Sequence, residues 1–83
     1  AQDSVALLRS YRQKADEQKQ KLLERAAAQL ADGKAPDLVM QELANKLTNT
    51  LIHGPTAALK KAAENQDKST LTLLEDALGL KAE

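Results

Sequence analysis

The stretch LVMQELANKLTNTLIHGPTAAL, residues 38–59, decides how the rest of this chain can fold. Apolar residues recur in it at steps of three and four, which is the spacing of one face of an α-helix. The members of this apolar face are Val39, Met40, Leu43, Ala44, Leu47, Leu51 and Ile52. The face is broader than the two-position seam of a coiled coil, so the stretch predicts the central helix of a small helical bundle.

The apolar face of this central helix stops at His53-Gly54-Pro55. Glycine tolerates the backbone angles of a helix exit. Proline suits the first turn of a helix, because its missing N–H would have no partner there. We therefore expect one helix to end at His53 and the next to begin at Pro55 or Thr56, with Gly54 in a sharp corner.

Three further helices follow from the same signals of apolar spacing and capping. Asp3 or Ser4 can cap the first helix and Gly33 can end it, while Asp67 or Ser69 can cap the last and Gly79 can end it. The expected helices are residues 4–32, 36–53, 55–66 and 68–78, with a frayed tail at 81–83. The sequence thus predicts an all-α fold in which a long N-terminal helix is followed by three shorter helices.

The length of the first helix predicts that the chain pairs with a second copy. Residues 4–32 would span about 43 Å at 1.5 Å per residue, which the shorter helices cannot cover. The middle of this helix, RQKADEQKQK at residues 12–21, is almost entirely polar and predicts a solvent-exposed neck. Apolar faces this broad are commonly buried by symmetric pairing of identical chains. We expect a single domain, residues 1–83, whose bundle is completed by homodimerisation through the second helix and the end of the first.

Composition excludes several classes of function. The 83 residues contain no cysteine, so there is no disulfide, thiolate metal site or thiol nucleophile, as fits a cytoplasmic protein. Twelve basic and twelve acidic residues cancel, which argues against a dedicated nucleic-acid or anionic-membrane binder. No apolar run approaches the roughly 18–20 residues that a membrane span requires.

The sequence predicts no catalytic, cofactor or metal site. His53 is the only histidine, and no carboxylate stands at metal-ligand spacing from it. The serines fall at expected helix caps or exposed positions, and there is no glycine-rich phosphate loop. His53 has a structural explanation instead, since a histidine in the last turn of a helix can donate to free carbonyl groups.

One string of residues carries a resemblance to a known family. Lys46-Leu47-Thr48-Asn49, Leu51-Ile52-His53 and Pro55-Thr56 together read KLTNxLIHxPT. With Leu7-Leu8-Arg9 upstream and Leu78-Gly79-Leu80 downstream, this pattern resembles the C-terminal dimerisation domain of glutamyl-tRNA reductase over essentially the whole chain. Two positions depart from the family pattern: Ala35, where an acidic residue is common, and Gln66, where glycine is common.

The resemblance implies a parent enzyme that reduces glutamyl-tRNA to glutamate-1-semialdehyde with NADPH, in tetrapyrrole (porphyrin) biosynthesis. Its nucleophilic cysteine and dinucleotide loop have no counterpart here, so no catalytic or cofactor residue is carried over. Residues 1–32 would be the end of a long spinal helix, and 33–83 the remaining dimerisation helices. Because the chain opens on Ala1 inside an apparent helix, we expect a piece of a longer protein. The positions implied at the dimer interface are Leu43, Leu47, Thr48, Leu51, Ile52 and Pro55.

Two alternatives stay open at the level of sequence. One is a surface that contacts tRNA, formed by Lys14, Lys19, Lys21, Arg25, Lys60 and Lys61. The other is a generic helical adaptor unrelated to the reductase.

Overall fold

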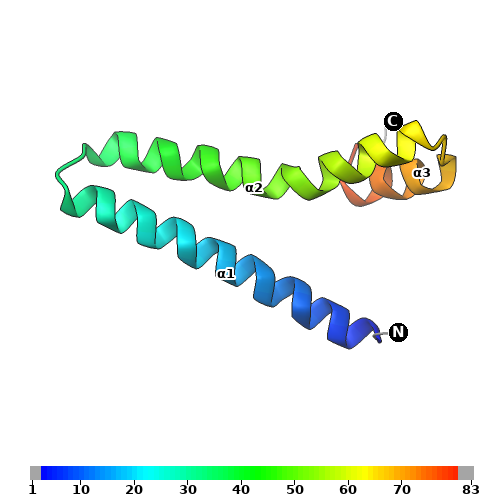
Figure 1. Cartoon of the computed structure of the whole chain (residues 1–83), viewed down its shortest axis with the longest axis horizontal. Helices are drawn as coiled ribbons and strands as arrows, with labels where there is room; N and C mark the ends of the chain where they lie inside the picture. The colour runs from blue at the N-terminus through cyan, green and yellow to red at the C-terminus, as the bar shows by residue number, and fades with distance from the viewer. Residues whose placement is uncertain (1–2, 81–83) are drawn as a thin grey trace. The chain divides into compact units, whose positions relative to one another are not determined.

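The computed structural model describes residues 3–80 and is entirely helical between its turns (Figure 1). The helices are α1 (Ser4–Ala31), α2 (Pro36–Glu64) and α3 (Lys68–Ala77). Asp3 caps α1, because its carboxylate accepts a hydrogen bond from the Ala6 N–H at 2.8 Å. The all-α class and the long first helix are confirmed, and the expected tail at 81–83 lies outside the described residues.

The described part of the chain forms three helices rather than the four expected, because α2 continues through Gly54 and Pro55. Proline costs the helix one hydrogen bond, the one an N–H at position 55 would donate to the carbonyl of Leu51. Gly54 lessens a second obstacle. A proline ring clashes with the Cβ of the residue before it, and glycine has none. The prediction of a corner was therefore wrong, and the Gly-Pro pair lies inside a helix.

All three helices end in the same type of turn. The residue after each C-cap has a positive φ, +89° at Gly33, +54° at Gln66 and +70° at Gly79. At each end the following N–H donates to a carbonyl five residues back, over 2.8 to 3.1 Å. This is the Schellman motif, as expected at Gly79-Leu80.

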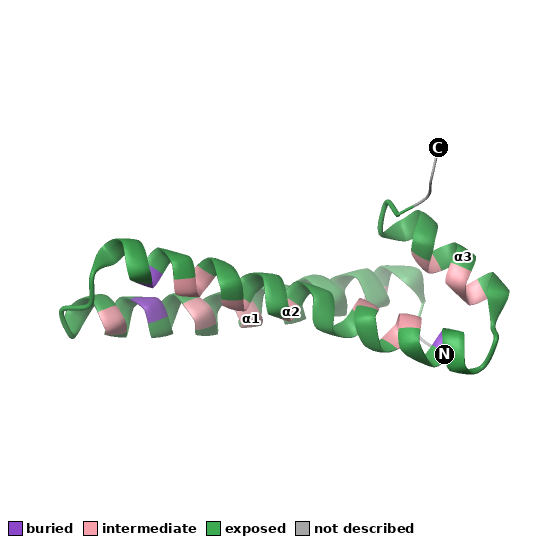
Figure 2. Cartoon of the chain, turned by 90° about the horizontal axis from the view of Figure 1, so that it is seen from above, coloured by how far each residue is buried: buried purple, intermediate pink, exposed green. Residues whose placement is uncertain are grey.

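The chain divides into two compact units, residues 1–50 and 51–83. In the first unit, α1 turns at Gly33 and packs antiparallel against the first half of α2 (Figure 1). Ala26 of α1 and Val39 of α2 are buried, and Figure 2 shows buried positions on both helices of this unit. Residues 36–50 rise only about 22 Å, against about 42 Å for the 28 residues of α1. The start of α1 therefore extends beyond this pairing within the unit, and the polar stretch 12–21 is exposed but for Gln18.

The second unit consists of the last part of α2 and α3. Ala62 is buried, and Leu59, Leu71 and Leu74 are half-buried. Asp67 caps α3 by accepting hydrogen bonds from the Thr70 N–H at 3.1 Å and the Thr70 hydroxyl at 2.6 Å. A third hydrogen bond comes from the hydroxyl of Ser69, at 3.1 Å. These bonds hold the pKa of the Asp67 carboxyl below its ordinary value, because each favours the charged form.

Candidate dimerisation surface

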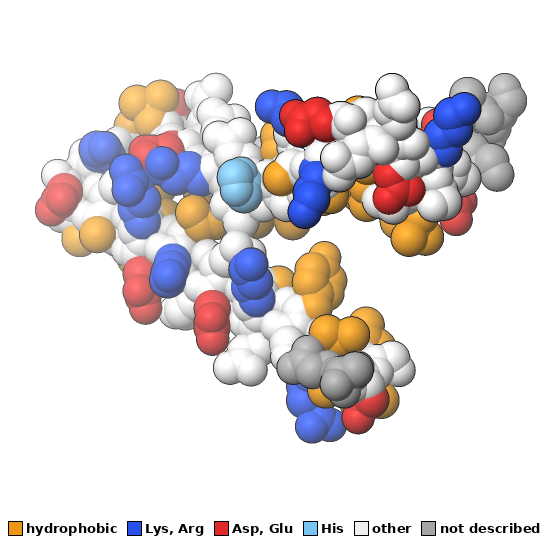
Figure 3. All heavy atoms as spheres, turned by 45° about the vertical axis from the view of Figure 1, so that its right-hand side comes forward, with side chains coloured by type: hydrophobic (Ala, Val, Ile, Leu, Met, Phe, Trp, Pro, Cys, Tyr) orange, Lys and Arg blue, Asp and Glu red, His pale blue; other side chains and the backbone are white. Residues whose placement is uncertain are grey.

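Most large apolar side chains of the described residues are exposed. Figure 3 shows several groups of apolar side chains on one face. Among residues 3–80, the buried hydrophobic residues are Ala26, Val39 and Ala62, all small or medium in size. The exposed ones are Val5, Leu7, Leu8, Tyr11, Leu23, Leu30, Leu38, Met40, Leu47, Leu51, Ile52, Leu73, Leu78 and Leu80. Monomeric soluble proteins rarely expose large apolar patches, so a place where several of these side chains gather indicates an interaction surface.

In the first unit, three of the predicted interface residues lie on α2. Leu43 is half-buried at the contact with α1, while Leu47 is 43% exposed and Thr48 is exposed. The Thr48 hydroxyl donates to the carbonyl of Ala44 at 3.0 Å. Because this bond satisfies the hydroxyl within the helix, Thr48 can be covered by an apolar partner without leaving that donor unpaired.

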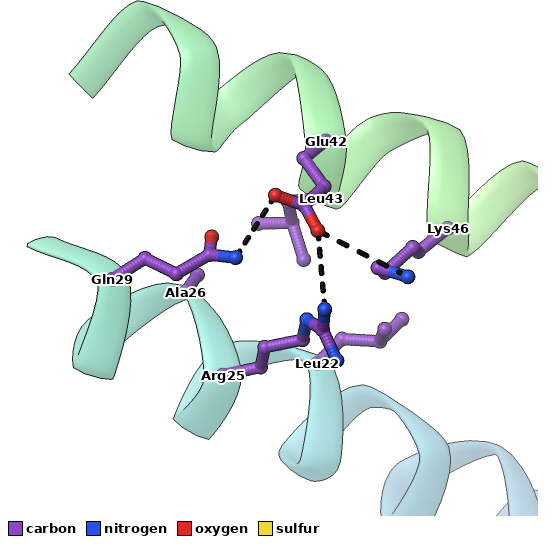
Figure 4. A pocket seen from close by; sticks show the side chains of 7 residues that line it. All are labelled: Leu22, Arg25, Ala26, Gln29, Glu42, Leu43 and Lys46. Atoms are coloured by element: carbon purple, nitrogen blue, oxygen red, sulfur yellow. Dashed lines mark hydrogen bonds and ion pairs between the residues drawn. The ribbon is translucent and has the colours of Figure 1, made fainter. Parts of the chain in front are cut away.

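A polar seam joins α1 to α2 beside Leu43 (Figure 4). Glu42 accepts a hydrogen bond from the Gln29 side chain at 2.9 Å. Its other carboxylate oxygen lies 3.4 Å from a guanidinium nitrogen of Arg25 and 4.0 Å from Nζ of Lys46. The Gln29 hydrogen bond, helped by the positive charges of Arg25, Lys34 and Lys46, outweighs desolvation and holds the pKa of Glu42 below its ordinary value.

The polar seam has a structural role. The hollow among its residues has a volume of about 10 Å³, which is room for a single water molecule at most. Each charged group in it already faces a partner from the chain itself. The seam therefore fixes how α1 lies against α2 and offers no space for a substrate or cofactor.

In the second unit, the other three predicted residues line one groove. Leu51, Ile52 and Pro55 form it together with Thr56, Leu59, Leu78 and Leu80, around a volume of about 410 Å³. Leu51 is 65% exposed and Ile52 52% exposed, while Pro55 is half-buried. The lining is apolar except for Thr56, which suits it to another apolar surface.

Leu78 and Leu80 were not among the predicted interface residues. Both come from the end of α3, so apolar spacing along α2 could not reveal them. The signal in the sequence was Gly79, because a Schellman ending folds the residue after the glycine back toward the helix.

The described residues offer little to other kinds of function. No group of three or more potential metal ligands occurs among residues 3–80. No helix in that range is long and apolar enough to cross a membrane. Of the six basic residues considered for tRNA, Lys19 pairs with Asp16 at 3.9 Å and Arg25 pairs with Glu42. The basic set is thus partly neutralised by neighbouring carboxylates.

Comparison with known proteins shows which family the chain resembles. The model of the family described as glutamyl-tRNAGlu reductase, dimerisation domain, matches residues 1–80. The chain is 56% identical over 79 residues to the glutamyl-tRNA reductase of Pseudoalteromonas atlantica, covering 95% of the chain. It is 46% identical over 81 residues to that of Pseudoalteromonas translucida, covering 98%, and 44% identical over 78 residues to that of Photobacterium profundum, covering 94%.

The chain spans 19% of the length of each of these relatives. No solved structure matches it significantly. A match this extensive does not favour the generic adaptor or the dedicated tRNA-contacting module. The chain belongs to the glutamyl-tRNA reductase dimerisation-domain family.

Proposed function

We propose that this domain holds two copies of its parent chain together through apolar patches on α2. In the first unit the patch is Leu43, Leu47 and Thr48, and in the second it is the groove around Leu51, Ile52 and Pro55. The observation that carries the proposal is the exposure of Leu51 and Ile52, 65% and 52%, in a member of a dimerisation family. Complete burial of one such side chain contributes about 1.5–3 kcal/mol, so covering both with a second copy would stabilise a dimer.

The parent protein has a proposed activity as well. Like its relatives by name, it would be a glutamyl-tRNA reductase, with glutamyl-tRNA as substrate, NADPH as reductant and glutamate-1-semialdehyde as product. It would act in the cytoplasm, in tetrapyrrole biosynthesis. Residues 1–32 would be the end of a longer helix leading into the domain, and 33–83 the rest of it. The catalytic and NADPH-binding groups would then lie in other domains, and this one would set the spacing of two catalytic units.

The test places a charge inside or outside the proposed interface. Leu51→Glu is compared with Leu38→Glu, because Leu38 is 60% exposed on the same helix. Leu38 also stands nine residues before Leu47, which puts it about 180° away around the helix axis at 3.6 residues per turn. Glutamate and leucine have similar helix propensities, so neither change weakens α2 by itself.

Sedimentation across a concentration series measures the dissociation constant of the dimer for each variant. Wild type and Leu38→Glu should form a dimer with similar dissociation constants. Leu51→Glu buries one unpaired charge from each copy and should raise the constant roughly 100-fold or more. A wild-type chain that stays monomeric at every concentration, or equal effects of the two variants, would contradict the proposal.

A further inference from the structure

The charges of α3 stand in the unfavourable order for a single helix. Lys68 is its first residue, and Glu75 lies in its last turn. The helix dipole favours acidic groups at the N-terminal end and basic groups at the C-terminal end. Asp67 caps the N-terminal end of α3, but the first turn has no acidic residue and the last turn no basic one. Lys68 and Glu75 therefore gain little from their own helix dipole, and both remain available to pair with groups of opposite charge.

Lys68 and Glu75 belong to one stripe of α3, which we call the α3 stripe: Lys68, Leu71, Thr72 and Glu75. The spacing of three, four and seven residues places all four on one side of the helix. With Leu59 and Leu80 they line a hollow of about 460 Å³. The Thr72 hydroxyl donates to the Lys68 carbonyl at 2.9 Å, so it is satisfied within the helix. The α3 stripe thus has a positive end, a centre of Leu71 and Thr72, and a negative end.

We propose that the α3 stripe packs antiparallel against the α3 stripe of a second copy, so that Lys68 of each chain pairs with Glu75 of the partner subunit. The midpoint of the stripe falls between Leu71 and Thr72, and its charged ends are about 10.5 Å apart along the axis. Turning the stripe end to end about this midpoint exchanges its positive and negative ends. Two identical stripes are therefore complementary about a twofold axis, which is the requirement for a symmetric homodimer interface.

The position of the hollow in the second unit supports a second copy as the occupant. It shares Leu59 and Leu80 with the groove around Leu51, Ile52 and Pro55. Because the two surfaces share these residues, a second copy that covers the groove can contact the α3 stripe in the same interface. The inference rests on the proposed homodimer and adds to it the contact that sets the direction of the two α3 helices.

Charge reversal tests the pairing in the 83-residue chain. Lys68→Glu and Glu75→Lys each replace two attractions with two repulsions, and each should weaken the dimer about tenfold in dilute salt. The double variant restores both pairs, so its dissociation constant should return to within about twofold of wild type. An equimolar mixture of the two single variants should form heterodimers in preference to either homodimer. High salt should shrink all of these differences.

Two controls separate pairing from folding. Both single changes improve the match of α3 to its dipole, so helix content by circular dichroism should not fall. Asp76→Lys makes the same change in net charge as Glu75→Lys one residue outside the stripe, and it should leave dimerisation unchanged.

The outcomes distinguish the two proposals. If the wild-type chain is dimeric but the single variants behave like Asp76→Lys, or the double variant is no better than the single ones, the α3 pairing is wrong and the homodimer stands. A monomeric wild type overturns both.

Discussion

Gln66 holds a backbone conformation that residues with a Cβ seldom adopt. Its φ of +54° closes the end of α2, where its N–H donates to Ala63 and the N–H of Asp67 donates to Ala62. The left-handed region costs a non-glycine residue roughly 1–2 kcal/mol, a strain that Gly33 and Gly79 avoid at the other two helix ends. Gln66 is therefore a local weak point in the single chain.

Gln66→Gly should stabilise the chain. Relief of the strain exceeds the extra entropy that glycine loses on folding, so the free energy of unfolding should rise by about 0.5–1 kcal/mol. Urea unfolding at one fixed chain concentration measures the change. Gln20→Gly, in the exposed middle of α1, is the matched control and should lower the same free energy by up to about 1 kcal/mol. Equal losses in the two variants would show that Gln66 is not strained.

At the scale of the helices, short-range chemistry made some features predictable and others not. The N-caps and the glycine endings depend on a few adjacent residues. The sequence predicted the endings at Gly33 and Gly79 and limited each N-cap to two candidates, of which the structure shows Asp3 and Asp67. The helix boundary predicted at Pro55 was wrong, because a glycine followed by a proline is usually a strong signal of a helix end.

A longer window would have corrected the reading of Pro55. Leu51, Pro55, Leu59 and Ala62 continue the helical spacing across the proposed corner. The groove was predictable only in part, because Leu78 and Leu80 reach it through the fold of α3. An apolar residue can join an interface only if its side chain is exposed in the single chain. That exposure depends on how several helices pack, which the sequence alone does not show.

The polar seam between α1 and α2 predicts a loss of stability in acid. The pKa of Glu42 is lower in the folded chain than its ordinary value of 4.5. Its contribution is therefore complete above that value and is lost as the pH falls through the lower folded pKa. Asp67, whose ordinary value is 3.8, contributes in the same direction.

Glu42→Gln should consequently be less stable than wild type at neutral pH but should lose less further stability below about pH 4.5. Thermal unfolding of both proteins between neutral pH and about pH 3 measures the difference. Parallel decline of the two profiles would mean that the contacts of Glu42 with Gln29 and Arg25 do not stabilise the packing of α1 against α2.

At the scale of the whole chain, the small core and the exposed apolar surface point to folding coupled to pairing. Eighty-three residues bury about 60–65% of the surface that the unfolded chain exposes, and only three hydrophobic residues of the described part are buried. Domains with such limited cores have little free energy of unfolding to spare. A second copy that covers α2 adds the missing burial, so the stability of the domain should depend on its concentration.

The loss in free energy of unfolding caused by Leu47→Ala should differ between a monomeric and a dimeric chain. In a lone chain Leu47 is 43% exposed, so its truncation should cost no more than about 1 kcal/mol. If a second copy buries it, the cost should reach about 2–5 kcal/mol per chain. Leu7→Ala, at a site 53% exposed beyond the polar stretch of α1, is the control and should stay near the smaller value.

Thermal unfolding over a wide range of chain concentrations measures this difference. The wild-type unfolding midpoint should rise with concentration, because folding and dimerisation are coupled. An unfolding midpoint independent of concentration, with equally small losses of stability for Leu47→Ala and Leu7→Ala, would mean that no second copy covers Leu47.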